Sequence, residues 1–247
     1  MDRVAELVAR FESAAARAVP WDLGRTSRSR DPDADPLDEL VVATVELPGG
    51  PLSLLRPADP DALAFEPVGR DVGGDGTEWH PPHWARLWPS ATVLASALAN
   101  DELDGARVLE LGCGLGLPSL AAARAGAHVL ATDLSPAAVA LTSVNAAHNG
   151  LDVDVAVADW TAPPDVVTAG APWDLVVAAD VLYGQWADNL LADLLPRLVG
   201  TEGAVLVTDP GREPADRFLH AADAWDVQSR DAGGGGVALH LLRLSDR

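Results

Sequence analysis

The sequence predicts an α/β protein built on a doubly wound, mostly parallel β-sheet. From about Ala106 onward, short apolar segments alternate with helical segments, which is the pattern of strand–helix units. The apolar segments are hydrophobic on both faces, as strands are when helices cover both sides of a sheet. Near the end of the chain, two β-like segments are joined directly through Gly233–Gly236, so we expect an antiparallel pair at one edge.

Five strands of the parallel region are expected over Arg107–Leu111, His128–Asp133, Val153–Ala158, Trp173–Asp180 and Gly203–Asp209. The edge pair and the helices between the strands are expected over Trp225–Ser229, Val237–Leu244, Leu117–Ala125, Ser135–Asn149 and Trp186–Leu198. Ser135 is the expected N-cap of its helix, with Pro136 in the first turn. Gly150 supplies a C-terminal stop for the same helix.

The first 80 residues predict an extension that precedes the main domain. The extension contains, in chain order, an amphipathic helix over Val4–Val19, a polar linker over Gly24–Pro36, a β-hairpin formed by Leu40–Leu47 and Leu52–Leu55, and a glycine-rich loop over Gly69–Gly76. We therefore divide the chain into an extension, residues 1–80, and a main domain, residues 81–247.

Composition narrows the class of function. The chain has 247 residues and a formal net charge of −20, from 37 acidic and 17 basic side chains. Such a field repels polyphosphate, so nucleic acid is a disfavoured partner, whereas a basic protein or an amine is favoured. The chain has one cysteine, acidic residues near its start where a signal peptide would be basic, and no long apolar run. The sequence therefore predicts a cytoplasmic protein without a membrane span.

A glycine-rich turn follows the first parallel strand. Gly112, Gly114 and Gly116 have the spacing G-x-G-x-G, whereas a dinucleotide-binding turn has G-x-G-x-x-G. Asp133 ends the next strand, about where a carboxylate binds ribose hydroxyls. The turn indicates a nucleoside-type ligand; a glycine turn without a ligand is the alternative, as is an Asp133 that only stabilises a helix N-terminus.

Two further places on the chain bear on ligand binding. Asp159 and Trp160 end the third strand, where the acid can accept from an adenine amine and the indole can cover the ring. The alternative is an exposed acid beside a core tryptophan. His80 and His83 have no cysteine or further histidine near them in sequence, and the two prolines between them prevent a shared helical face, so we expect no metal site.

The chain resembles the seven-β-strand methyltransferases, and more narrowly their methyltransferase-16-like group of lysine methyltransferases. The segments that carry the resemblance are Glu110–Gly116, Ala131–Asp133, Asp159–Trp160 and Asp180–Tyr183. Pro82–Ser90 is similar to a tryptophan-containing stretch that precedes the core in this group. Thr208–Arg212 is similar to a segment of the electron-transfer-flavoprotein β-subunit lysine methyltransferases.

This resemblance implies a Rossmann-like fold with strand order 3-2-1-4-5-7-6 and S-adenosylmethionine as the methyl donor. The residues it implies at the cofactor are Glu110, Gly112, Gly114, Gly116, Asp133, Asp159, Trp160 and, closing the site, Trp88. It implies catalytic roles for Asp180, which can hold an ammonium and accept its proton, and for Tyr183, whose ring favours methylammonium. A helix cap and a half-buried core aromatic are the alternatives for these two residues.

The acceptor stays open between two classes. A protein lysine is the first expectation, and an amine-bearing small molecule is the second, because both use every motif described above. A dinucleotide-dependent oxidoreductase is disfavoured by the glycine spacing, and an intact Asp180 and Tyr183 disfavour a binding module without catalysis. Methyl transfer from a sulfonium needs no metal, and we expect no nucleic-acid or membrane partner.

Overall fold

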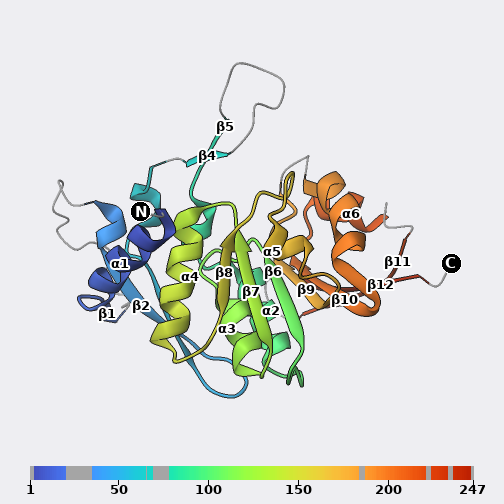
Figure 1. The fold of residues 1–247 in the computed structure, drawn as a ribbon, viewed down its shortest axis with the longest axis horizontal. Helices are drawn as coiled ribbons and strands as arrows, with labels where there is room; N and C mark the ends of the chain where they lie inside the picture. Colours follow the sequence, from blue (N-terminus) through green and yellow to red (C-terminus); the bar gives the residue numbers. More distant parts are fainter. Residues whose placement is uncertain are drawn as a thin grey trace.

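The structure is a computed structural model, and it describes residues 3–20, 35–64, 66–68, 78–183, 187–220, 224–232 and 236–245. A seven-stranded sheet forms its centre, in the order β11-β12-β10-β9-β6-β7-β8 (Figure 1). The strands are β6 Arg107–Leu111, β7 His128–Asp133, β8 Asp154–Val157, β9 Trp173–Ala179, β10 Val199–Asp209, β11 Trp225–Asp231 and β12 Ala238–Leu244. Read from the β8 edge, this order is 3-2-1-4-5-7-6, as expected.

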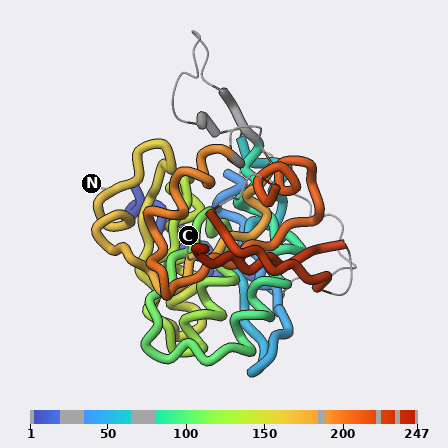
Figure 2. The backbone as a smooth tube through the Cα atoms, turned by 90° about the vertical axis from the view of Figure 1, so that its right-hand side faces the viewer, coloured from blue at the N-terminus to red at the C-terminus, as the bar shows by residue number. Residues whose placement is uncertain are grey.

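The sheet is parallel from β8 to β10 and antiparallel where β12 pairs with both β10 and β11. The strand that runs in the opposite direction is therefore β12, the second from its edge. Figure 2, seen from that end, shows β11 and β12 in red across the front of the molecule. The expected antiparallel pair is confirmed.

Helices cover both faces of the sheet. They are α2 Pro89–Leu98, α3 Leu117–Arg124, α4 Pro136–His148, α5 Asp165–Thr168, α6 Ala187–Leu198 and α7 Glu213–His220. Val108 belongs to one apolar cluster, with side chains of α2, α3 and α4, whereas its neighbour Leu109 belongs to a second cluster, with α6 and α7. Because adjacent strand residues point to opposite faces, these clusters are the two cores of a doubly wound fold.

The start of α4 differs in one respect from the sequence expectation. Ser135 is the N-cap residue, as expected, and the helix ends with Asn149 at the C-cap and Gly150 at a φ of 67°. The Ser135 side chain, however, makes no capping hydrogen bond. Instead, the Asp133 carboxylate accepts from the Ser135 backbone N–H at 2.9 Å, so the acid at the end of β7 organises the turn before the helix.

The N-terminal residues form α1 Arg3–Ala15 and a three-stranded sheet of β1 Val19–Pro20, β2 Leu40–Val45 and β3 Leu52–Pro57. β2 and β3 are antiparallel, which confirms the hairpin. Short 3-10 helices lie at Pro36–Asp38, Pro60–Ala62 and His83–Ala85, and β4 Glu66–Val68 pairs with β5 Glu78–His80. Most of the expected linker over Gly24–Pro36, and all of the loop over Gly69–Gly76, lie outside the described residues.

This N-terminal part packs on α4. Phe11 of α1 and Leu54 of β3 are fully buried in the same apolar cluster as Leu141 of α4. The Asn145 side chain of α4 accepts from the Leu55 N–H at 2.7 Å and donates to the Leu55 carbonyl at 3.0 Å, which fixes β3 against the helix. The division of the chain at residue 80 stays a prediction.

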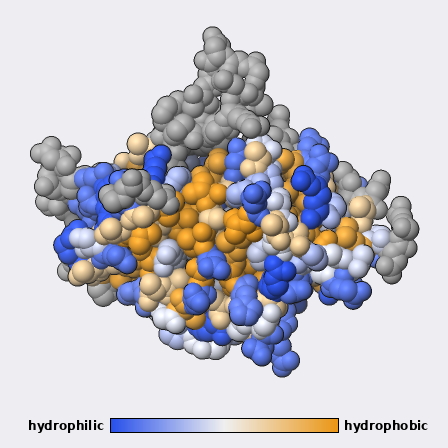
Figure 3. Space-filling view, in the orientation of Figure 1, coloured by the Kyte–Doolittle hydropathy of each residue, from blue (hydrophilic) through white to orange (hydrophobic). Residues whose placement is uncertain are grey.

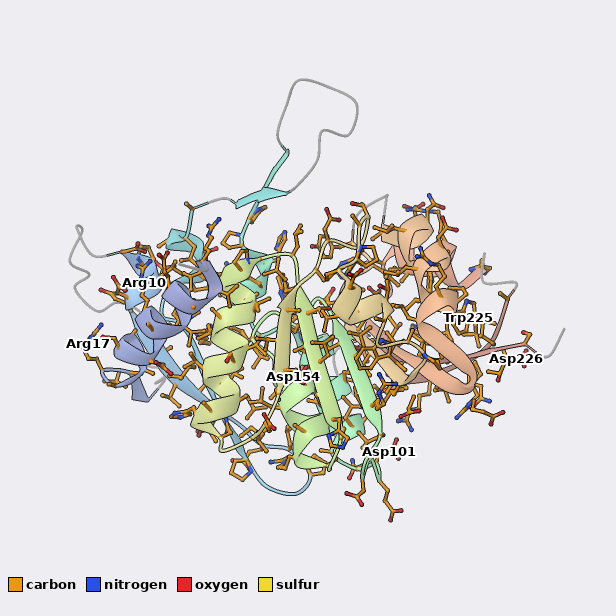
Figure 4. All side chains as sticks on the ribbon, in the orientation of Figure 1. Arg10, Arg17, Asp101, Asp154, Trp225 and Asp226 are labelled. Carbon is orange, nitrogen blue, oxygen red and sulfur yellow. The ribbon has the colours of Figure 1, made fainter. Side chains whose placement is uncertain are left out.

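Helix α1 and strand β11 lie at opposite ends of the molecule. In Figure 4, Arg10 of α1 and Arg17, which follows that helix, lie at one end, and Trp225 and Asp226 of β11 lie at the other. Figure 3 shows apolar surface over the middle of the same view, between the more polar ends. Within the described ranges, no helix is both long enough and apolar enough to cross a membrane.

Candidate functional site

The carboxyl ends of the parallel strands bring the expected site residues to one edge of the sheet. β6 leads into the glycine turn, β7 ends at Asp133, and β10 ends at Asp209. Asp159 follows β8 and Asp180 follows β9 directly. This edge of an open α/β sheet is where such folds bind their ligands, so four carboxylates and the turn at Gly112 lie in the right place for a site.

Steric crowding explains the glycines of the turn. Gly112, Gly114 and Gly116 have positive φ values of 72°, 54° and 83°. A Cβ on Gly112 would lie 2.9 Å from Cγ1 of Val181, and one on Gly116 would lie 2.6 Å from Cγ2 of Thr142. Other residue types therefore meet both backbone strain and a clash, and the turn can approach a ligand with its backbone.

Asp133 is tied to this turn. Its Oδ2 accepts a hydrogen bond from the Gly114 N–H at 3.0 Å, while its Oδ1 accepts from the Ser135 N–H. Two polar atoms close to these residues are buried and have no hydrogen-bond partner, the Ser135 Oγ and the Trp84 Nε1. The backbone carbonyl of Trp84 would lie 3.2 Å from a Cβ on Gly114, so the segment before α2 lies against the turn.

Glu110 lies behind the turn. It is 1% exposed, and its Oε2 accepts from the Ser119 N–H at 2.9 Å and from the Ser119 hydroxyl. Burial raises the pKa of Glu110 to about 8, although the Ser119 hydrogen bonds lower it. The structure thus places Glu110 where it braces the turn against the first residues of α3, and not among the more exposed site residues.

Asp159 and Trp160 lie beside the turn, and both are half-buried. The Asp159 Oδ1 accepts from the Thr161 N–H at 2.8 Å and from the Thr161 hydroxyl at 2.6 Å. A Cβ on Gly112 would lie 3.7 Å from Cζ2 of Trp160, so the indole borders the glycine turn. Cys113, within the turn, is buried, and burial raises the pKa of its thiol, which makes it a poor nucleophile.

Asp180 is held in an unusual conformation at the end of β9. Its φ is 60°, a value in the left-handed region that residues other than glycine rarely adopt. Its N–H donates to the Thr208 carbonyl at 2.8 Å. The carboxylate is ion-paired with Arg212 through Oδ1, and its Oδ2 accepts from the Ser90 hydroxyl at 3.3 Å. Since α6 begins only at Ala187, Asp180 does not cap that helix.

Tyr183 belongs to an aromatic group at the same edge. It is 48% exposed, and its ring centroid lies 5.4 Å from that of His83, edge to face. The His83 ring is 6.0 Å from that of Trp88, whose Nε1 donates to the His83 carbonyl at 2.9 Å. Partial burial, and then the charges of Asp133 and Asp180, raise the pKa of Tyr183, so its phenol is neutral at physiological pH.

Three of these participants were not expected from the sequence. His83 was considered only as a metal ligand, and Ser90 and Arg212 were given no role. Arg212 had two signals: it lies in Thr208–Arg212, one of the segments that carry the family resemblance, and it closely follows Asp209, which ends a strand at the ligand-binding edge. Among the residues that the structure describes, no group of three or more histidine, cysteine, aspartate or glutamate side chains is arranged to hold a metal ion.

Comparison with known proteins identifies the family. A family model described as lysine methyltransferase matches residues 83–224. The electron transfer flavoprotein beta subunit lysine methyltransferase of Xenopus laevis is 36% identical over 135 residues, 53% of this chain and 53% of that protein. A protein N-lysine methyltransferase of Danio rerio is 33% identical over 151 residues, 55% of this chain and 68% of that protein.

The chain spans about half the length of the first of these relatives. Among solved structures, a 16S rRNA N2 methyltransferase from T. thermophilus aligns with a TM-score of 0.59 at 17% identity, over 86% of this chain and 53% of that one. At this identity the likeness concerns the fold alone. With the family model matching more than half of its residues, the chain belongs to the lysine methyltransferase family.

Proposed function

We propose that this chain transfers a methyl group from S-adenosylmethionine to the side-chain nitrogen of a protein lysine. The observation that carries the proposal is the position of Asp180, a buried carboxylate at the same sheet edge as the glycine turn and near the exposed ring of Tyr183. The two relatives named above, which are named as lysine methyltransferases, support the same acceptor.

The residues around the turn suit an adenosyl cofactor. Glycine at positions 112 and 114 lets Val181 and the Trp84 backbone pack closely against the turn, which holds the turn backbone at the ligand-binding edge of the sheet. The Gly114 and Ser135 N–H groups orient the Asp133 carboxylate at the carboxyl end of β7, where a carboxylate can accept from ribose hydroxyls. In this proposal Asp159 and Trp160 bind the adenine.

The other proposed cofactor residues have supporting roles. Gly116 begins α3 in the left-handed conformation and so sets the direction of the helix N-terminus. Glu110 keeps that helix start in register with the turn through Ser119. Trp88, fixed by its bond to the His83 carbonyl, closes the site from the N-terminal side.

When bound, S-adenosylmethionine supplies a methyl group on a positively charged sulfur. The acceptor amine must reach it without a proton, although the pKa of a free lysine is about 10.4. In this proposal Asp180 binds the incoming ammonium, orients it and accepts its proton at a carboxylate oxygen, directly or through water. The Tyr183 ring forms one wall of the acceptor site and stabilises the cationic product.

An amine-bearing small molecule is the second candidate acceptor. The same carboxylate and ring suit any primary amine, and the net charge of −20 favours cations of either kind. For the location of the activity we propose the cytoplasm, in keeping with one buried cysteine, Cys113.

Labelling distinguishes the two acceptors. The chain is incubated with methyl-labelled S-adenosylmethionine and a protein extract and, separately, with the small-molecule fraction of that extract. We expect label in a protein band, mapped to a lysine. Label that enters only small molecules contradicts the first candidate and supports the second.

A further inference from the structure

Arg212 lies between two carboxylates at the end of the sheet. Its Nη1 is ion-paired with Oδ1 of Asp180 and lies 3.5 Å from Oδ2 of Asp209. The Asp180 and Asp209 side chains are 7% and 0% exposed, whereas that of Arg212 is 36% exposed. The two acids are thus fixed in the core, and the base reaches them from the solvent side.

The charges at this place do not balance. Two buried carboxylates share one guanidinium, and in the described part of the chain Arg212 is the only cation recorded in an ion pair with either of them. His240 is near enough to feel the charge of Asp209, but burial lowers the pKa of the imidazole, so it is neutral at pH 7. A buried, uncompensated negative charge is costly, and burial correspondingly raises the pKa of Asp209, so a second cation that pairs with one of the two carboxylates would be stabilised here.

Asp209 can accept the guanidinium. Its Oδ1 accepts from the backbone N–H groups of Gly211 and Arg212, at 2.7 and 2.8 Å, and so fixes the backbone from which the Arg212 side chain extends. Its Oδ2 is buried and has no hydrogen-bond partner. Since the guanidinium nitrogen is already 3.5 Å from this oxygen, a small side-chain rotation makes a full charge-assisted hydrogen bond.

We propose that Arg212 is a movable counter-ion, which pairs with Asp180 while the acceptor site is empty and shifts onto Asp209 when a cationic acceptor binds Asp180. The inference rests on the proposed role of Asp180 in binding the acceptor. After the shift, each carboxylate has its own cation, and the free oxygen of Asp209 has a partner.

This exchange makes Arg212 a positioning residue that also selects the acceptor. A neutral or anionic molecule cannot replace a guanidinium on a buried carboxylate, so only a cation opens the site. The exchange also has a cost, since the acceptor must displace an existing ion pair. Without Arg212 the site therefore binds cations more tightly.

The test uses n-butylammonium, which has the length and charge of a lysine side chain, and the neutral n-butanol. Binding to the chain saturated with S-adenosylhomocysteine is followed by NMR titration at constant ionic strength. We expect Arg212→Gln to bind n-butylammonium roughly tenfold more tightly than wild type, because the competing charged hydrogen bond is gone. Asp209→Asn keeps its backbone bonds but loses the second position for the guanidinium, so it binds several-fold more weakly.

Two variants serve as controls. Arg217→Gln removes an arginine of α7 that is ion-paired with Glu213, one helical turn away, and should stay within about twofold of wild type. Arg212→Lys keeps the charge and should restore binding close to the wild-type value. Thermal unfolding of each variant shows that it is folded before its titration is interpreted.

The outcomes separate this inference from the proposed function. If Arg212→Gln binds n-butylammonium no more tightly than wild type, or does not bind it, the counter-ion exchange is wrong, whatever the wild type methylates. If Arg212→Gln binds more tightly and n-butanol binding is unaffected, the exchange holds. If the wild type then transfers no methyl group to any protein or amine, the proposed function fails alone.

Discussion

The carboxylate of Asp133 accepts a hydrogen bond from the backbone N–H of Gly114, at 3.0 Å. This bond joins the residue that ends β7 to the turn that follows β6. The acid therefore shapes the glycine turn before any ligand is bound, and the ribose-binding role proposed for Asp133 begins from a carboxylate that is already oriented.

Gly116→Ala should disrupt the turn. Its φ of 83° strains an alanine, and the added Cβ would lie 2.6 Å from Cγ2 of Thr142. Gly150→Ala is the matched control, because its φ is 67° but nothing lies within 4 Å of a Cβ there. We expect Gly150→Ala to lose about 1 kcal/mol of unfolding free energy from strain and Gly116→Ala about 2 kcal/mol or more. Urea unfolding measures both; equal losses would refute the steric argument.

Asp133→Asn should weaken cofactor binding. The amide nitrogen of asparagine cannot accept, so either the Gly114 or the Ser135 N–H then faces a donor. We expect the dissociation constant of S-adenosylhomocysteine to rise about tenfold or more. Calorimetric titration measures it, with Asp154→Asn, an exposed acid at the start of β8, as the control. An affinity equal to that of the control would exclude Asp133 from the cofactor site.

Asp180→Asn should abolish methyl transfer and leave the affinity for S-adenosylhomocysteine within a few-fold. The variant keeps a group of the same shape but loses the charge that holds an ammonium and the base that accepts its proton. Single-turnover rates and calorimetric titration give the two quantities on one preparation. Retained transfer would remove the catalytic role of Asp180, while a large loss of affinity would place it at the cofactor instead.

Glu110 predicts a specific dependence of stability on pH. Its pKa is about 8 in the folded protein, against an ordinary value of 4.5. The protonated Glu110 side chain therefore makes its full contribution to the free energy of unfolding below about pH 4.5, and this contribution is lost as the pH rises toward 8. Gln at this position keeps an acceptor for Ser119 and does not ionise. The free energy of unfolding of Glu110→Gln should therefore rise relative to that of wild type by up to about 1.4 kcal/mol per pH unit in this window. Urea unfolding from pH 5 to 8 measures the difference; a constant difference would contradict a buried, protonated Glu110.

The positions of the parallel strands and the glycine turn were predictable because each follows from local sequence, whereas the strand order was implied by the resemblance to the seven-β-strand methyltransferases. An apolar segment such as Trp173–Ala179, in which only Asp174 is charged, is hydrophobic on both faces and is followed by the polar Asp180, which indicates a buried parallel strand. Three helices, α2, α5 and α7, were not predicted. The α7 sequence is largely polar, with only Ala215 and Phe218 buried, so its apolar pattern is short.

The side-chain partnerships of the site were not predictable in the same way. Arg212 and Asp180 are separated by 32 residues, and their ion pair depends on the adjacency of β9 and β10. The contacts of His83 with Tyr183 and of Ser90 with Asp180 also join residues that are far apart in the sequence. Ser135 is the N-cap residue as predicted, but its side chain makes no capping hydrogen bond, and its own N–H donates to Asp133, a contact that the sequence did not predict.

The central claim is that the chain methylates a lysine nitrogen. Its most direct measurement is mass spectrometry of a protein extract after incubation with S-adenosylmethionine that carries a deuterated methyl group, with wild type and Asp180→Asn in parallel. The account predicts deuterated methyl groups on lysine Nζ with the wild type and none with the variant. Deuterated methyl groups on oxygen or carbon atoms, or on lysine equally with both proteins, would contradict it.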